Sequence, residues 1–195
     1  GAPTWPVERD QISQAMAKLD PAFVLFTGDF VLQGNDQAEW DNWFRAMDRY
    51  WVTSEGRMIP IIPCMGNHEV EIGGGRNFLK QFKLPNNEQW YSINWGPDVH
   101  IVVLNTENLC EEQVDWLKQD LEASQATWKI VVMHKSPYSS GPHALVDNRD
   151  VRNIRHELCR VFDNFHVDLV FCGHEYFYER SYPVYQGTVY PCLLY

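Results

Sequence analysis

The amino-acid sequence predicts one α/β domain in which helices lie outside buried strands. Three observations support this class: short apolar runs recur along the chain, helical patterns of apolar residues separate them, and most runs end abruptly in polar residues. Buried strands that alternate with amphipathic helices are typical of α/β domains. The length of 195 residues, of which 45% are apolar, suits a single domain over residues 1–195 with a substantial core.

The first half of the chain supplies two helices and two strands. Apolar residues at helical spacing cover 12–19, and the unbroken apolar run 23–26 then predicts a strand buried on both faces. A second helical pattern covers 40–51. The run 58–63 contains prolines, which suit a strand near the edge of a sheet.

The second half repeats this alternation after a hairpin. The segments 90–93 and 99–104 flank a turn-rich stretch and predict two antiparallel strands. The remaining elements are a helix around 114–121, a strand at 129–133, a long helix at 151–165 and a strand at 167–171.

Composition excludes some kinds of partner. The formal net charge is −10 and the lysines and arginines form no block, so binding to a nucleic-acid backbone is not expected. A phosphate-bearing substrate is compatible with this charge, because a bound divalent metal can reverse the sign of a site on an acidic protein. No apolar stretch is long enough to predict a membrane segment.

The two ends of the chain look like the edges of an excerpt. The sequence opens at Gly1 without Met, and it closes on the apolar residues 192–195, which read like a strand cut short. For that reason the sequence predicts no compartment for the protein.

Four of the apolar runs are followed at once by polar clusters. If the strands share a sheet, the loops after their carboxyl ends gather along one rim, which is where α/β domains bind ligands. Carboxylate, amide and imidazole groups together suit Mn²⁺, Fe, Zn²⁺ or Mg²⁺. The glycines of the clusters are expected to take backbone dihedrals closed to other residues. The clusters are Gly28-Asp29, Gly66-Asn67-His68-Glu69, His134 and Gly173-His174-Glu175.

Each of these residues also has a structural explanation when it is taken alone. An Asp after a Gly is often a turn or N-cap residue, an Asn often caps a turn, and a single His is often a hydrogen-bonded structural residue. Their joint occurrence, in this order and always after an apolar run, favours a metal site.

In this order the four clusters resemble the motifs of the calcineurin-like metallophosphoesterases. The segments 87–93, 99–107 and 173–180 look like the purple-acid-phosphatase-related branch of that family. The resemblance covers nearly the whole chain. It implies a four-layer α-β-β-α sandwich, with two sheets face to face, helices outside and a two-metal site at one end. Measured against that fold, we expect the chain to lack the first strand and the last one.

The resemblance also implies roles for single residues. Asp29 would bridge the two metals, and Asn67, His134 and His174 would complete the shell of one of them. The other metal has fewer candidate ligands, because the family has a second His where this chain has Tyr176. Whether Tyr176 is a ligand or a packing residue stays open.

Three further residues receive roles from the resemblance. His68 would not bind metal but would protonate the leaving group or stabilise developing charge, Glu69 would orient His68, and His143 would line the substrate pocket. The purple enzymes use a Tyr where this chain has Leu32, so a purple Fe³⁺ site is not expected.

The function implied is hydrolysis of phosphate esters by a metal-activated water. The cofactors would be divalent ions of Mn, Fe, Zn or Mg, two in the family and one well occupied here. The partner would be a phosphorylated small molecule or other phosphoester. The alternative is a catalytically impaired protein of this fold that binds one metal and a phosphate-bearing ligand.

Overall fold

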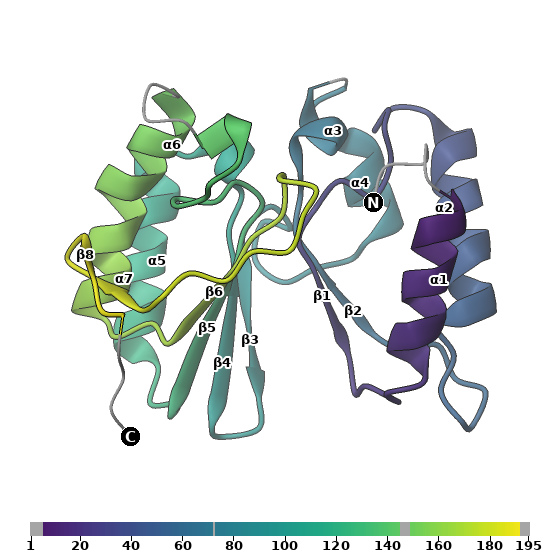
Figure 1. Ribbon diagram of the computed structural model, residues 1–195, viewed down its shortest axis with the longest axis horizontal. Coiled ribbons are helices and arrows are strands. Elements are labelled where there is room, and N and C mark those ends of the chain that lie inside the picture. The colour runs from purple at the N-terminus through teal and green to yellow at the C-terminus, as the bar shows by residue number, and fades with distance from the viewer. Residues whose placement is uncertain (1–5, 72, 145–148, 192–195) are drawn as a thin grey trace.

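The computed structural model describes residues 6–71, 73–144 and 149–191, and it shows two halves that each pair a sheet with helices (Figure 1). Residues 192–195, in which the sequence predicts the start of a further strand, lie outside the described residues. That a first and a last strand are missing from the fold stays a prediction.

One half contains a parallel pair of strands. β1 (Val24–Phe26) runs beside β2 (Ile61–Pro63), with Leu25 opposite Ile62. Two long helices, α1 (Pro6–Ala17) and α2 (Gln37–Tyr50), lie on the outer side of this sheet (Figure 1). The short helices α3 (Asn67–Val70) and α4 (Arg76–Gln81) follow β2.

The helix α2 illustrates why these residues fold as they do. Asp36 caps its first turn by accepting a hydrogen bond from the backbone N–H of Ala38, 2.8 Å away. Trp40, Trp43 and Met47, spaced three and four residues apart, form its buried face. The apolar stripe therefore fixes which side of α2 packs on the sheet.

The other half contains a four-stranded sheet in the order β3-β4-β5-β6. The hairpin of β3 (Tyr91–Trp95) and β4 (Val99–Val103) is antiparallel, as predicted. Both β5 (Trp128–Val132) and β6 (Leu169–Phe171) continue the sheet in parallel. A short hairpin, β7 (Val184–Tyr185) and β8 (Thr188–Val189), follows later in the chain.

Helices cover the outer side of this second sheet. They are α5 (Glu111–Ala123) and a continuous helical stretch made of α6 (Arg149–Ile154), a π-helical segment η3 (Arg155–Cys159) and α7 (Arg160–Asn164). Single turns of 3₁₀ helix lie at Thr106–Asn108 and Pro142–Ala144. Among the described residues, the helices are all too short or too polar to traverse a bilayer.

Three separate hydrophobic clusters show that the domain has four layers. One packs α1 and α2 against β1, with Trp43 and Met47 at its centre. The second, which includes Ile62 and Ile101, lies between the two sheets. The third packs α5 and the α6–α7 stretch against β4 and β5. Three interfaces require helix, sheet, sheet and helix in that order, which confirms the α-β-β-α sandwich.

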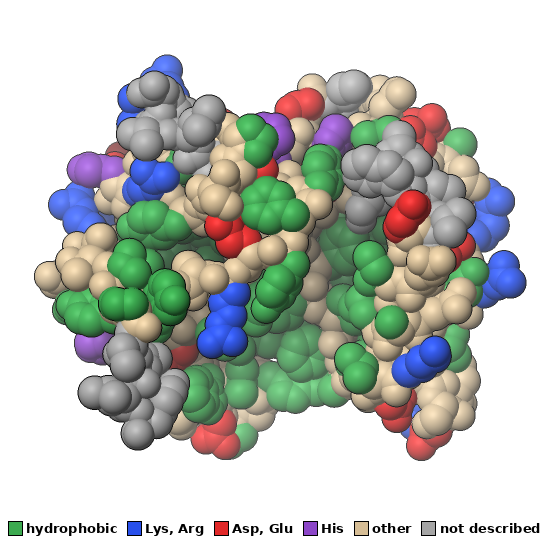
Figure 2. Space-filling view, viewed as in Figure 1, with side chains coloured by type: hydrophobic (Ala, Val, Ile, Leu, Met, Phe, Trp, Pro, Cys, Tyr) green, Lys and Arg blue, Asp and Glu red, His purple; other side chains and the backbone are tan. Residues whose placement is uncertain are grey.

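The strand β6 differs from its prediction. Its apolar run suggested a buried strand, but Leu169, Val170 and Phe171 are 49%, 37% and 43% exposed. The reason is position, because among the described residues β6 is the edge strand of its sheet and pairs with β5 on one side. Figure 2 shows hydrophobic side chains gathered in the hollow between the two halves on this face.

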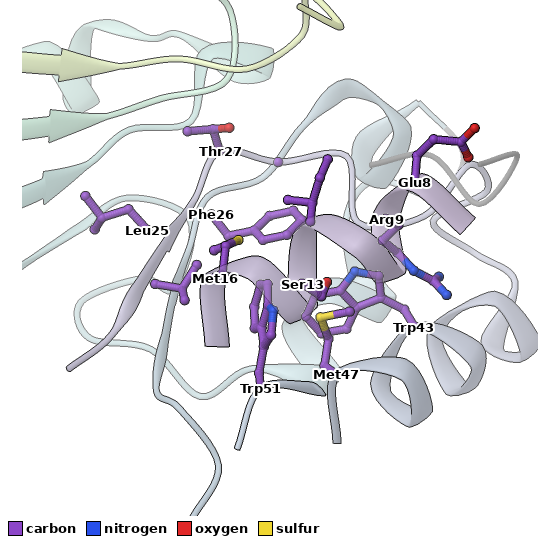
Figure 3. Close-up of a pocket in the computed structure, with 13 residues that line it drawn as sticks. Glu8, Arg9, Ser13, Met16, Leu25, Phe26, Thr27, Trp43, Met47 and Trp51 are labelled. Atoms are coloured by element: carbon purple, nitrogen blue, oxygen red, sulfur yellow. The ribbon is translucent and has the colours of Figure 1, made fainter. Parts of the chain in front are cut away.

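An apolar cavity of about 330 Å³ lies between α1, β1 and α2 (Figure 3). Met16, Phe26 and Trp51 contribute to its wall. The indole N–H of Trp51 is buried without a hydrogen-bond acceptor among the described residues, which disfavours the folded state. Thr27 and Gly28 line the cavity where β1 ends, and the chain leads from them into the polar cluster described next.

Candidate metal centre

The carboxyl ends of β1, β2, β5 and β6 point to the same end of the molecule, between its two halves (Figure 1). Histidine side chains are visible at this upper edge, with acidic side chains beside them (Figure 2). Each predicted metal ligand follows one of these four strands. Asp29 and Asn67 come from the first sheet, and His134 and His174 come from the second.

The donor atoms of these four side chains converge. Asn67 Oδ1 lies 3.0 Å from His134 Nε2 and 3.0 Å from His174 Nδ1, and the two ring nitrogens are 3.1 Å apart. Asp29 Oδ2 lies 3.3 Å from His134 Nε2. Ligand atoms of Asp29, His134 and His174 all fall within 4.8 Å of one another, so one ion could contact all of them. We call these four residues the metal cluster.

Two hydrogen bonds outside the metal cluster aim its donors inward. The carbonyl of Thr27 accepts from His134 Nδ1 at 2.7 Å, so the lone pair of a neutral His134 ring lies on Nε2. The amide of Asn67 donates from Nδ2 to Glu71 Oε1 at 3.0 Å, which turns Oδ1 toward the cluster. Without these two partners the ring and the amide could turn their protons inward.

The charges of the metal cluster fit a cation. Burial lowers the pKa of His174 to about 4, with the neighbouring histidine charges acting in the same direction, so its ring is neutral at neutral pH. Burial opposes a charge on His134, yet the hydrogen bond and charge of Asp29 raise its pKa overall. The pKa of Asp29 is lowered, because the bond and charge of His134 outweigh its burial. Both shifts favour an ion pair of Asp29 with a protonated His134, which would place positive charge where a metal would bind.

Unusual backbone conformations place the cluster side chains. Gly28 has φ +91°, as expected, and a Cβ there would lie 2.6 Å from His134 Nδ1. Asp29 and His174 themselves have φ of 58° and 69°, a left-handed region that side chains disfavour and that is often held at functional sites.

The expectation for Gly66 and Gly173 was wrong. Neither has a positive φ, and both are required for space instead. A Cβ on Gly66 would lie 2.3 Å from Asp29 Oδ1, and one on Gly173 would lie 2.7 Å from the carbonyl oxygen of Thr27. Glycine is needed at Gly66 because the loops after β1 and β2 lie in contact, and at Gly173 because the loop after β6 approaches the end of β1.

His68 lies beside the metal cluster but not in it. Its Nδ1 donates to the carbonyl of Leu32 at 2.9 Å, and its backbone N–H donates to Asp29 Oδ1 at 3.3 Å. Its other ring nitrogen, Nε2, lies 3.3 Å from the hydroxyl of Tyr176, on the side of the cluster. The ring is therefore held next to Asp29 with its reactive edge toward the site.

The role expected for Glu69 needs correction. Its carboxylate does not orient the His68 ring, a task that the Leu32 carbonyl performs. Instead Glu69, only 1% exposed, accepts hydrogen bonds of 2.8–3.3 Å from backbone N–H groups. It therefore holds the Asp29 loop against the loop that carries Asn67 and His68. The donors are Asp29, Phe30, Val31 and Gly66.

Replacing Glu69 by Ala is expected to destabilise the protein. The substitution leaves several buried backbone N–H groups without an acceptor, and each such group costs about 1–3 kcal/mol. We expect the free energy of unfolding to fall by about 3 kcal/mol or more, measured by chemical denaturation. Glu122→Ala, an exposed position on α5, is the matched control. An equal midpoint for the two variants would contradict this role.

His143 and Glu175 form a pair next to the metal cluster. The rings of His143 and His174 have centroids 4.6 Å apart, so His143 lies at the edge of the metal cluster. Glu175 accepts from the backbone N–H of His143 at 2.9 Å and faces its Nδ1 at 3.2 Å. Sequence reasoning assigned no role to Glu175, although it follows His174 directly.

Tyr176 offers little to a second metal. Its hydroxyl lies 3.4 Å from Asp29 Oδ2, and burial together with the Asp29 charge raises its pKa to about 12. A neutral phenol and a carboxylate that already belongs to the first cluster do not make a metal site of their own. Within the described part of the chain, the residues fit one ion.

Comparisons with known proteins identify relatives of this chain. An uncharacterized protein of Mycobacterium tuberculosis is 30% identical over 89% of this chain and 37% of its own length. Acid phosphatase type 7 of Mus musculus is 31% identical over 86% of this chain and 42% of its own. The Fe(3+)-Zn(2+) purple acid phosphatase 12 of Arabidopsis thaliana is 29% identical over 81% and 37%.

The chain thus spans well under half the length of these relatives. The family model for calcineurin-like phosphoesterases matches residues 6–178, which is most of the chain. With that match and the sandwich fold described above, the chain belongs to the calcineurin-like phosphoesterase family.

Proposed function

We propose that the protein hydrolyses phosphate esters with the help of a divalent metal held by Asp29, Asn67, His134 and His174. The convergence of these four donors at the joint carboxyl ends of two sheets carries the proposal. Membership of the family and the names of two relatives, both phosphatases, support the reaction class. When bound, the metal supplies positive charge that lowers the pKa of a coordinated water and attracts phosphate oxygens.

The residues of the site have separate roles in metal binding, proton transfer and phosphate binding. Asp29 provides the negative charge that a cation needs, and Asn67 with the two histidines gives neutral donors, a set that suits Mn, Fe, Zn or Mg. His68 lies outside the donor set and next to it, which suits a group that gives a proton to the leaving oxygen. His143 is half exposed at the rim, where it would contact the phosphate group of the substrate.

Metal removal tests the proposal. We expect the protein purified with a chelator to lack activity toward 4-nitrophenyl phosphate, and we expect Mn²⁺, Zn²⁺ or Fe²⁺ to restore it as about one ion per chain is taken up. Metal content by mass spectrometry and initial rates are measured on the same samples. Activity that survives complete metal removal contradicts the proposal. Uptake of metal and phosphate without turnover favours a protein that binds but does not hydrolyse.

A further inference from the structure

Two carboxylates hold the loop 139–143 against the segment that follows β6. Glu175 accepts hydrogen bonds from the backbone N–H and from Nδ1 of His143. Glu179 accepts from the hydroxyl of Ser139 at 2.6 Å and from the backbone N–H of Ser140 at 3.0 Å. The loop therefore depends on acidic side chains from a segment far away in the sequence.

The two contacts differ in their surroundings. The Glu175 side chain is only 9% exposed, whereas His143 is 50% exposed. Glu179 is exposed to water, and its hydrogen bonds to described residues go to Ser139 and Ser140 at the start of the loop. Glu175 is shielded from water and contacts both the backbone N–H and the Nδ1 of His143. It can therefore fix the orientation of the His143 ring, which exposed ion pairs rarely do.

Glu175 is also linked to the metal cluster by a single peptide bond. His174 has φ of 69°, and this turn sends its side chain into the cluster while the next side chain goes to His143. The carboxylate of Glu175 is used by His143 and not by the cluster. The distance between the metal cluster and the His143 ring is thus set by two consecutive residues.

We propose that Glu175 is a positioning residue that holds His143 for the phosphate group of the substrate. A carboxylate facing Nδ1 requires a proton on that nitrogen, so the tautomer and the plane of the ring are fixed together. The ring then stands beside His174, where a phosphate held by the metal cluster would lie. This inference rests on the proposed function, since it assigns a task within the same site.

A double-mutant cycle tests the proposal in metal-loaded protein. Glu175→Gln keeps the shape of the side chain but offers an N–H group in place of one acceptor. We expect it to weaken binding of inorganic phosphate about tenfold and to raise KM for 4-nitrophenyl phosphate similarly. The kcat value should change by less than about threefold, and metal content should not change. In a His143→Ala background the Glu175 substitution should have no further effect.

Two more variants sharpen the result. Gly141→Ala should reproduce the effect of Glu175→Gln, because a Cβ on Gly141 would lie 2.3 Å from Glu175 Cδ and must displace that carboxylate. Glu157→Gln is the matched control, since Glu157 pairs with His156 Nδ1 at 2.8 Å on the exposed surface of the helical stretch. It should leave phosphate binding unchanged.

The outcomes separate this proposal from the proposed function. Additive effects of the Glu175 and His143 substitutions overturn it, as does loss of metal in Glu175→Gln or an unchanged dissociation constant for phosphate. If the unmodified protein binds metal and phosphate but does not turn over, the proposed hydrolysis fails. In that case the double-mutant cycle uses only the dissociation constants for phosphate measured by calorimetry, and these constants decide whether Glu175 positions His143. Absence of any phosphate binding overturns the role.

Discussion

Replacing His134 by Ala is expected to remove the metal and, with it, all measurable phosphatase activity. The side chain is fully buried, and its Nε2 lies within 3.3 Å of donor atoms from the other three cluster residues. Loss of an outer partner of a metal ligand already lowers metal affinity about 10–100-fold. Loss of the ligand itself should exceed that range, so equilibrium dialysis should show metal affinity lower by more than about 100-fold.

Two controls keep this result interpretable. His156→Ala removes an exposed imidazole that pairs with Glu157 and does not belong to the cluster, so this variant should retain metal and activity. Because His134 is buried and its loss could disturb folding, His174→Ala provides a second test at a half-buried ligand. Circular dichroism shows whether each variant is folded. A folded His134 or His174 variant that keeps the metal affinity of the unmodified protein would remove these residues from the ligand set.

Replacing His68 by Ala should lower kcat about 10²–10⁴-fold, the usual contribution of a general acid or base, while metal content stays the same. The ring is anchored by the Leu32 carbonyl and approaches the cluster only with its Nε2 edge. Its removal therefore takes away a proton donor without taking away a ligand. Rates are measured at saturating 4-nitrophenyl phosphate, with metal content determined on the same preparation.

The outcome for His68 discriminates between two roles. Loss of metal together with activity would make His68 a ligand or a support of Asp29, to which its backbone N–H donates. Unchanged kcat with unchanged metal would place the proton donor elsewhere in the site. His156→Ala again serves as the control, because it changes the same kind of side chain at the surface.

The candidate site could be predicted from sequence because strand ends are predictable. Short apolar runs identify β1, β2, β5 and β6 with small errors at their boundaries, and parallel strands bring their carboxyl ends together. Parallel pairing brings Asp29 near Asn67 and His134 near His174, whereas the contact between these two pairs depends on how the two sheets pack.

What sequence could not predict depends on backbone groups and on neighbours. The Thr27 carbonyl orients His134 and the Leu32 carbonyl orients His68, and a carbonyl has no signature because every residue carries one. For the same reason the prediction paired Glu69 with the His68 ring, whereas its carboxylate accepts hydrogen bonds from backbone N–H groups. The exposure of β6 was missed because an apolar run looks the same in the middle of a sheet and at its edge.

The origin of the metal cluster in both sheets has a thermodynamic consequence. Asp29 and Asn67 follow strands of one sheet, while His134 and His174 follow strands of the other. An ion that binds all four residues links the two sheets to each other. Once the sheets separate, the four donors are no longer close enough to bind one ion. Binding and unfolding are therefore linked, and stability rises by RT ln(1 + [M]/Kd) with the concentration of free metal M. The free energy that holds the two halves together therefore depends on the concentration of free metal.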